Sequence, residues 1–230
     1  MMQLFLVRHG QSFNNTLPDG KGRVADPPLT DIGEKQAPLV AQHLASGSAK
    51  NPYHGDGPSG GFDITRLFTS AHLRCLQTSE PIGEALGMEP EIWVDVHEEC
   101  GIWMDEVDKL PGMTRSEIAD RFPRVVIPDE IGEEGWWNRP KETEAEWVER
   151  AQRVADELWN VYAETEERIA IVAHGGFIKD LLSALIVGGP LSNAHISSRN
   201  TSITHLSFAD DQLFVGSVNR VDHLAAELVT

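Results

Sequence analysis

The stretch LFLVRHGQSFNN, residues 4–15, decides the fold, because an apolar segment runs there directly into charged and polar side chains. Its opening residues are all apolar, which is typical of a strand covered on both faces of a parallel sheet. Arg8 and His9 follow at once, and Gly10 permits a sharp turn and a close approach of the backbone to a ligand. Ligands of open α/β sheets bind beyond the carboxyl ends of the strands, so this strand end is a candidate site.

Two later apolar runs, at 65–68 and 169–173, repeat this arrangement, since each ends in polar residues and leads into a helical pattern. This alternation predicts an α/β fold, a three-layer sandwich in which helices flank a mostly parallel central sheet. The clearest helix follows Thr143, whose spacing to Glu146 is that of a capping box. We expect one domain over residues 1–230, with a lid or insertion at about 100–140 and an exposed loop at 47–61.

The composition and charge of the chain exclude several classes of function. A formal net charge of −17 disfavours nonspecific binding to nucleic acid or to an anionic membrane, although a local basic pocket can still bind a small anion. No segment reaches the roughly 18 apolar residues that a membrane crossing needs, and no basic leader is evident, so we expect a cytoplasmic protein. Cys75 and Cys100 match no disulfide or zinc pattern and are expected to be free thiols. The oligomeric state is left open, with a homodimer as one option.

The stretch IAIVAHGGF, residues 169–177, is a second apolar strand that ends in a histidine, His174, and two glycines. A helix that begins there offers unpaired N–H groups and a partial positive charge to an anion. Arg74, in TSAHLRCLQT, adds a guanidinium whose fork suits phosphate oxygens. Taken alone, Arg8 and His9 fit two explanations equally well: a ligand site, or a surface arginine and a hydrogen-bonded histidine that bind no ligand. Two His-Gly strand ends in one chain favour the binding site.

These motifs, in this order, resemble the landmarks of the histidine phosphatase (phosphoglycerate mutase-like) superfamily over nearly the whole chain. The segments that carry the resemblance are LVRHGQSFNN, PLTDIGEKQA, TSAHLRCLQTSEPIGEALG, VHEECGIW, IVAHGGFIKDLL and NTSITHL. The resemblance implies a phosphoglycerate mutase-like fold and an enzyme in which a ring nitrogen of His9 attacks phosphorus and forms a phosphohistidine. It implies that the transferred phosphoryl group is held by Arg8, Arg74, His174, Asn15 and the amide of Gly175. Ser12, a hydroxyl close to the first motif, is a further candidate for a substrate contact.

The resemblance also implies a carboxylic acid that protonates the leaving group, and VHEECGIW offers Glu98 and Glu99 side by side. We favour Glu98, because its spacing to Gly101 matches the branch of the family that reads Glu-x-x-Gly. Other branches place the acid one residue earlier, where this chain has His97. No metal or other cofactor is expected, because HEEC (97–100) and DEVD (105–108) lack the partners and spacing of a zinc or calcium site.

Aromatic residues near this acid have two interpretations. Trp103, Trp136 and Trp137 either wall the substrate pocket or fill a core. The remaining histidines, including His72 and His195, are expected to be surface or core residues outside the site, although His72 precedes Arg74 by only two positions.

Three functions remain open, and we favour a metal-independent, histidine acid phosphatase-type enzyme that hydrolyses phosphomonoesters, with a small phosphorylated molecule as substrate. A phosphoglycerate mutase would use the same phosphohistidine, but that branch carries an Asn-Arg-Phe…Gly-Trp-x-Asp stretch that TLPDGKGRVADPPLT lacks. The acidic segment 129–144 also offers only Arg139 and Lys141 as cations. An inactive relative that binds a phosphorylated ligand is disfavoured, because the nucleophile, the arginines and the second histidine are all present.

Overall fold

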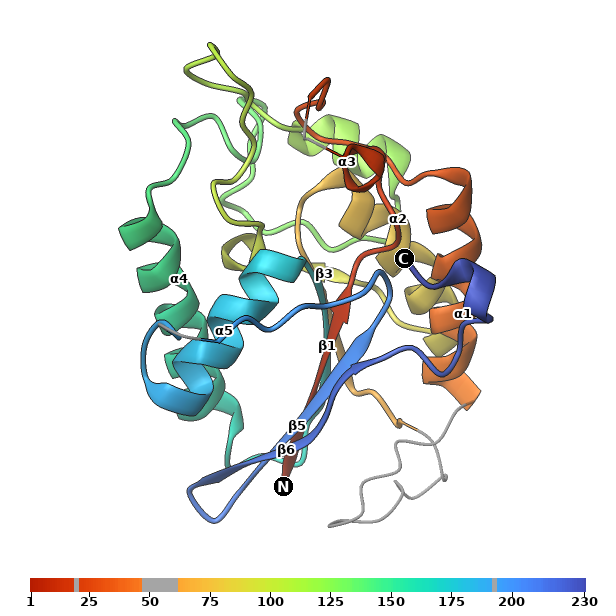
Figure 1. The fold of residues 1–230 in the computed structure, drawn as a ribbon, viewed down its shortest axis with the longest axis vertical. Helices are drawn as coiled ribbons and strands as arrows, with labels where there is room; N and C mark the ends of the chain where they lie inside the picture. Colours follow the sequence, from red (N-terminus) through yellow and green to blue (C-terminus); the bar gives the residue numbers. More distant parts are fainter. Residues whose placement is uncertain (19–20, 47–61, 192–193) are drawn as a thin grey trace.

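The computed structural model describes residues 1–18, 21–46, 62–191 and 194–230. Within these ranges the chain forms a six-stranded sheet in the order β3-β2-β4-β1-β5-β6, with helices on both faces (Figure 1). The strands are β1 (Met2–Arg8), β2 (Arg66–Thr69), β3 (Glu91–Ile92), β4 (Arg168–Ala173), β5 (Ile203–Ala209) and β6 (Gln212–Arg220). The helices are α1 (Asp31–Ser46), α2 (Leu73–Leu86), α3 (Arg115–Arg121), α4 (Glu144–Glu157) and α5 (Gly175–Val187), with shorter turns η1 (Phe13–Thr16), η2 (Val94–Val96), η3 (Leu158–Tyr162) and η4 (Ala226–Leu228). The loop expected at 47–61 lies outside the described residues.

The direction of the strands confirms the expected α/β fold with a mostly parallel sheet. β1 pairs in parallel with β4, and β4 and β3 both pair in parallel with β2. β5 and β6 form an antiparallel hairpin that joins the other edge of β1. Asp210 and Asp211 close this hairpin with φ angles of 51° and 58°, the positive values that tight two-residue hairpin turns require.

Alternate residues of β1 pack on opposite faces of the sheet. Leu4 and Leu6 belong to a buried cluster with α4 and α5, whereas Phe5 and Val7 belong to a second cluster with α1 and α2. Figure 1 shows these two pairs of helices on opposite sides of the sheet. Because helices cover both faces, the middle of the central strand must be apolar throughout, which explains its continuous apolar run.

A third buried cluster lies beside the start of α2 and is built mainly from the segment between β3 and α4. Trp136 and Trp137 are buried in it, with their ring centroids 5.7 Å apart. The interpretation as core residues therefore holds for these two tryptophans. Trp103 instead lines a cavity at the carboxyl ends of the strands.

The ends of the helices follow local signals in the sequence. α3 and α4 begin after Thr114 and Thr143, each of which forms a capping box with the glutamate three residues on. α5 ends at Gly188, whose φ of 72° is a left-handed conformation that glycine adopts at low cost. No helix in the described ranges combines the length and the apolar character that a membrane crossing requires.

Candidate active site

The register of β1 and β4 brings the two His-Gly motifs together. Arg8 pairs with Ala173 across the two strands, and the amide of His9 donates to the carbonyl oxygen of Ala173 at 2.9 Å. The rings of His9 and His174 consequently lie 5.2 Å apart between centroids. Parallel strands place their carboxyl ends at one edge of the sheet, so two motifs 165 residues apart in the sequence meet there.

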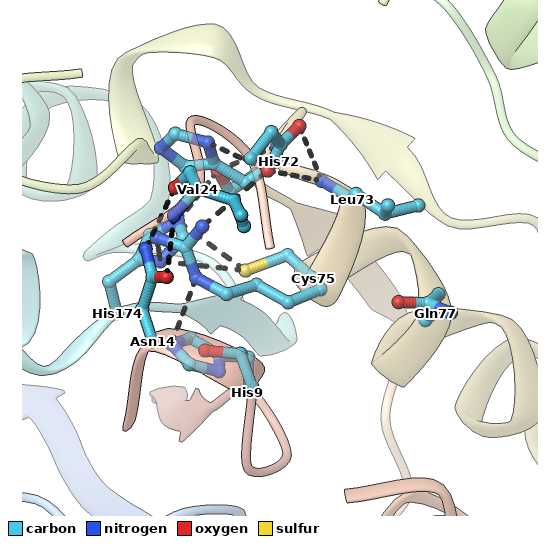
Figure 2. Close-up of polar contacts among 12 residues, drawn as sticks. His9, Asn14, Val24, His72, Leu73, Cys75, Gln77 and His174 are labelled. Carbon is cyan, nitrogen blue, oxygen red and sulfur yellow. Dashed lines mark hydrogen bonds and ion pairs between the residues drawn. The ribbon is translucent and has the colours of Figure 1, made fainter. Parts of the chain in front are cut away.

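Arg74, in the first turn of α2, bridges the two histidines. Its Nε lies 3.2 Å from His9 Nε2, and its Nη2 lies 2.9 Å from His174 Nδ1. Figure 2 shows His9, Cys75 and His174 gathered around these hydrogen bonds. The His174 Nε2 atom also lies 2.8 Å from the hydroxyl of Ser70, which follows β2. One buried guanidinium therefore fixes the orientation of both rings.

The hydrogen bonds of His9 define its tautomer. Nδ1 lies 2.7 Å from the carbonyl oxygen of Gly10, and a carbonyl oxygen only accepts, so Nδ1 carries the hydrogen. Nε2 therefore keeps its lone pair, to which Arg74 donates. Burial, together with the charges of Arg74 and Arg8, holds the pKa of His9 well below its usual value near 6.5. The ring is neutral at neutral pH, which is the state that a nucleophile needs.

We expect kcat/KM for an aryl phosphate, corrected for ionisation of the substrate, to stay level as the pH falls through 6.5. Because the pKa of His9 is lowered, the neutral ring persists below the pH at which a free histidine gains its proton. Nitrogen-15 spectra of histidine-labelled protein check the titration directly, with the His9 signals assigned by their loss in His9→Ala. A His9 titration at or above pH 6.5 would contradict this expectation.

A cavity of about 300 Å³ opens beside these side chains, large enough for a small ligand. Its lining residues are His9, Ser12, Asn14, Asn15, Arg23, Ala25, Pro27, His72, Arg74, Glu98, Glu99, Cys100, Gly101 and Trp103. The structure therefore brings together His9, Ser12, Asn15, Arg74 and Glu98, which the sequence singled out.

Three other residues expected in the site lie next to this cavity rather than in its described lining. His174 is held behind Arg74 by the hydrogen bond above. The Arg8 guanidinium donates to the carbonyl oxygen of Ser198 at 2.5 Å. Gly175 lies against this side chain, since a Cβ added there would be 3.4 Å from Arg8 Nε. The start of α5 thus packs closely on the arginine of the first motif.

The two adjacent glutamates have different partners. Oε1 of Glu98 accepts a hydrogen bond from the amide of Phe177 at 3.0 Å, which ties it to the first turn of α5. A Cβ on Gly176 would lie only 2.6 Å from that oxygen, so the second glycine of the motif is needed for this approach. Glu99 instead pairs with Lys179, with 2.5 Å between Oε1 and Nζ.

Asp26 and His72 also belong to this region. Reasoning from the sequence missed Asp26, and it placed His72 outside the site while noting that it precedes Arg74 by two positions. Both carboxylate oxygens of Asp26 accept from the amide of Leu73 at 3.1 Å, and Oδ1 lies 3.5 Å from Arg74 Nη1. Burial raises the pKa of Asp26 to about 6, against the lowering effect of Arg74. His72, expected outside the site, is buried and lines the cavity. Its position directly before the first turn of α2, two residues from Arg74, was the available signal.

Asn200 is a further residue whose position the sequence did not predict. Its side-chain nitrogen donates to the carbonyl oxygen of His9 at 3.0 Å and to Oδ1 of Asn15 at 3.2 Å. The amide of Ser12 also donates to Oδ1 of Asn15, at 3.0 Å. The residues after the first motif are therefore held from the loop that precedes β5, and the segment NTSITHL, which begins at Asn200, carried the signal.

Hydrogen bonds hold the residues before Asp26 against η1. Asn14 makes two hydrogen bonds with the backbone of Val24, at 2.9 and 3.0 Å (Figure 2). The neighbouring Arg23 lies over the ring of Trp103, with 3.7 Å between its Cζ and the ring centroid. Burial and the charge of Arg74 lower the pKa of Arg23. A second cation therefore lines the cavity, together with Arg74.

Metal ligands do not cluster in the described part of the chain. There, no group of three or more His, Cys, Asp and Glu side chains is arranged to hold a metal ion. That the chemistry needs no metal remains a prediction.

The family model described as the histidine phosphatase superfamily (branch 1) matches residues 4–57 and 59–221 of the chain. This protein belongs to the histidine phosphatase superfamily. The resemblance of the motifs is thereby confirmed. A curated relative named probable phosphoglycerate mutase GpmB, from Yersinia enterocolitica, is 28% identical over 214 residues, which cover 91% of this chain and 86% of the relative. A protein of the same name from Photorhabdus laumondii is 38% identical over 135 residues, 56% of this chain and 54% of its own length.

Solved structures share the fold of this histidine phosphatase superfamily member. A mycobacterial glucosyl-3-phosphoglycerate phosphatase matches with a TM-score of 0.60 and 22% identity, over 95% of this chain and 99% of its own. The ecdysone phosphate phosphatase from Bombix mori matches with a TM-score of 0.68 and 14% identity, over 98% of this chain and 96% of its own. These two likenesses confirm the phosphoglycerate mutase-like fold. The family and its named relatives support an enzyme.

Proposed function

We propose that this protein is a phosphatase that hydrolyses phosphomonoesters of small molecules through a phosphohistidine on His9. The observation that carries the proposal is the lone pair of His9 Nε2, held 3.2 Å from Arg74 Nε in the wall of a cavity that Glu98 also lines. A neutral nucleophile, a fixed cation and a carboxyl group in one cavity are what phosphoryl transfer through a covalent intermediate requires.

In the first step, Nε2 of His9 attacks phosphorus and the bond from phosphorus to the ester oxygen breaks. Arg74 transfers its hydrogen bond from the ring to a phosphoryl oxygen, which frees the lone pair. Arg8 and His174 stabilise the charge that develops on the other oxygens, helped by the Gly175 amide. Asn15, whose Oδ1 already accepts from Ser12 and Asn200, donates through its amide nitrogen. The hydroxyl of Ser12 contacts the substrate at the edge of this group.

Glu98 supplies the proton that the leaving oxygen needs. Its carboxyl group lines the cavity beside His9, and the amide of Phe177 fixes one of its oxygens. Glu99 also lines the cavity, but its carboxylate is paired with Lys179. In the second step the Glu98 carboxylate takes a proton from water, the water oxygen attacks phosphorus, and the bond to Nε2 breaks. Phosphate leaves and both residues return to their starting states.

The segment at about 100–140 acts in this proposal as a cover for the site. Trp103 lines the cavity, whereas Trp136 and Trp137 anchor the segment in the third buried cluster. Such a cover keeps bulk water from the reacting groups and contacts the part of the substrate beyond the phosphoryl group.

A phosphoglycerate mutase is the alternative, and Arg23 is the observation that favours it. Its Nε is buried and has no hydrogen-bond partner among the described residues, so it suits the carboxylate of a phosphoglycerate. Among the described residues that line the cavity, however, Arg74 is the only other lysine or arginine, and the segment 129–144 is strongly acidic. The scarcity of cations and the negative charge of this segment disfavour a substrate with several anionic groups, so we favour hydrolysis.

Assays of the wild-type protein decide between the phosphatase and the mutase. We expect it to release phosphate from several members of a panel of phosphomonoesters, and to interconvert 3- and 2-phosphoglycerate slowly or not at all. Phosphate release is measured with a colorimetric assay, and interconversion is followed in parallel on the same enzyme preparation. Rapid interconversion with little release of phosphate would overturn the phosphatase assignment.

A further inference from the structure

Arg150, on α4, is a buried arginine that reaches across to the loop carrying Glu98. It is only 1% exposed, although arginine is rarely buried to this degree without a partner. Nη1 donates to the carbonyl oxygens of Asp95 at 2.8 Å and His97 at 2.9 Å, and Nη2 lies 3.4 Å from the carbonyl oxygen of Glu98. One guanidinium therefore satisfies three backbone acceptors of residues 95–98.

The charge of Arg150 is balanced by Glu142, just before α4. Nε and Nη2 of the arginine bind the two carboxylate oxygens of Glu142 at 3.0 and 2.8 Å, a paired geometry that fixes the plane of the guanidinium. Burial alone would raise the pKa of Glu142, but its bonds to His97 and Arg150 lower it to about 2. Glu142 is thus charged at every physiological pH and holds the arginine in place.

The loop itself needs an external support. Cys100 and Gly101, two and three residues after Glu98, have φ angles of 69° and 68°. A left-handed conformation is unfavourable for cysteine, so the chain reverses here only because its surroundings hold it. Arg150 supplies hydrogen bonds on the other side of Glu98, and Phe177 supplies one to its carboxyl group.

We propose that Arg150 is a positioning residue for the proton donor: it fixes residues 95–98 so that the carboxyl group of Glu98 faces the reacting phosphoryl group. The inference rests on the proposed role of Glu98. Arg150 is not among the described residues that line the cavity, and it contacts the backbone of Glu98, so it acts on the reaction through Glu98. A shift of about 1 Å in a reacting group costs on the order of 100-fold in rate, which sets the scale of the expected effect.

The test is a double-mutant cycle on kcat/KM, which reports the phosphorylation step alone, with Arg150→Met, Glu98→Gln and the double variant. We expect Arg150→Met to lower kcat/KM for an alkyl phosphate by about 100-fold, but for an aryl phosphate only a few-fold, because an aryl leaving group needs little protonation. In the Glu98→Gln background the same change should cost only a few-fold on either ester. Equal losses on the two esters, or a full loss in the Glu98→Gln background, would overturn the inference.

Two variants serve as comparisons. Arg150→Lys keeps the charge but loses the planar guanidinium with its several donors. We therefore expect its rate with the alkyl ester to lie between those of wild type and Arg150→Met. It also replaces Arg150→Met in the cycle if that variant does not fold. Arg153→Met, one turn further along α4, removes an arginine that is 53% exposed and contacts Asp95 only through its side chain at 3.4 Å. This control should change kcat/KM little.

The rate at which Cys100 reacts with a thiol reagent measures how firmly the loop is held, without any catalytic assay. The chain has two cysteines, of which Cys75 is fully buried, so a thiol reagent reports on Cys100 under native conditions. We expect Arg150→Met to speed this labelling several-fold and Arg153→Met to leave it unchanged, with circular dichroism confirming the fold of each. An unchanged rate in Arg150→Met would overturn the inference. If the wild type released no phosphate, the proposed function would fail, and the labelling would still decide whether Arg150 holds the loop.

Discussion

His9→Ala is expected to lower kcat for phosphomonoester hydrolysis by about 10,000-fold or more, the range seen when a covalent nucleophile is lost. The ring nitrogen that would attack phosphorus disappears, and water has no equally placed substitute. The surrounding fold should persist, because alanine in this position keeps the backbone bonds of His9 to Ala173 and Asn200. Phosphate release at saturating substrate is the measurement.

His195→Ala is the matched control for this loss. His195 is an exposed histidine outside the cavity lining, so its removal should leave kcat within a few-fold of wild type. Rapid-quench experiments with a phosphorus-32-labelled substrate should trap an acid-labile, base-stable phosphoprotein in wild type and none in His9→Ala. Appreciable hydrolysis by His9→Ala with its fold intact would exclude the covalent mechanism.

Glu98→Gln is expected to lower kcat/KM for an alkyl phosphate by about 100- to 10,000-fold, the range typical of a lost general acid. The amide keeps the shape of the side chain but has no proton to give to the leaving oxygen. An aryl phosphate, whose leaving group is stable as an anion, should lose far less in its first step. The ratio of the two rates therefore reports on protonation, whereas each rate alone also reports on binding.

Glu99→Gln is the control for Glu98, since it changes the adjacent carboxylate that pairs with Lys179. We expect a few-fold loss that is equal for the two esters, because no proton passes through this side chain. If the leaving-group dependence appeared in Glu99→Gln and not in Glu98→Gln, the two roles would be exchanged.

Local patterns predicted much of the fold. The strands at 4–7 and 169–173 were recognisable because both faces of the sheet are covered, which requires apolar residues without alternation. The start of α4 was recognisable because Thr143 and Glu146 satisfy each other and the free amides within one turn. The hairpin of β5 and β6 was not predicted, because its turn of two aspartates resembles an ordinary polar loop.

For the candidate site, the sequence supplied the reactive groups but few of the residues that hold them. His9, Arg74, His174 and Glu98 were identified from motifs. Asp26, which caps the start of α2 beside Arg74, was missed because an aspartate before two prolines is ordinary turn composition.

The sequence by itself determined three of the parallel strands and the helices that follow them, the two His-Gly motifs and membership of the histidine phosphatase superfamily. Only the tertiary structure decided which nitrogen of His9 is free, that Arg74 bridges both histidines, and that Arg150 supports the Glu98 loop. The physical reason is the range of the interactions. Caps and strand patterns act between residues a few positions apart and leave a periodic trace. A hydrogen bond between Arg74 and His174, 100 residues apart, depends on strand register and helix packing and leaves no trace in the order of residues.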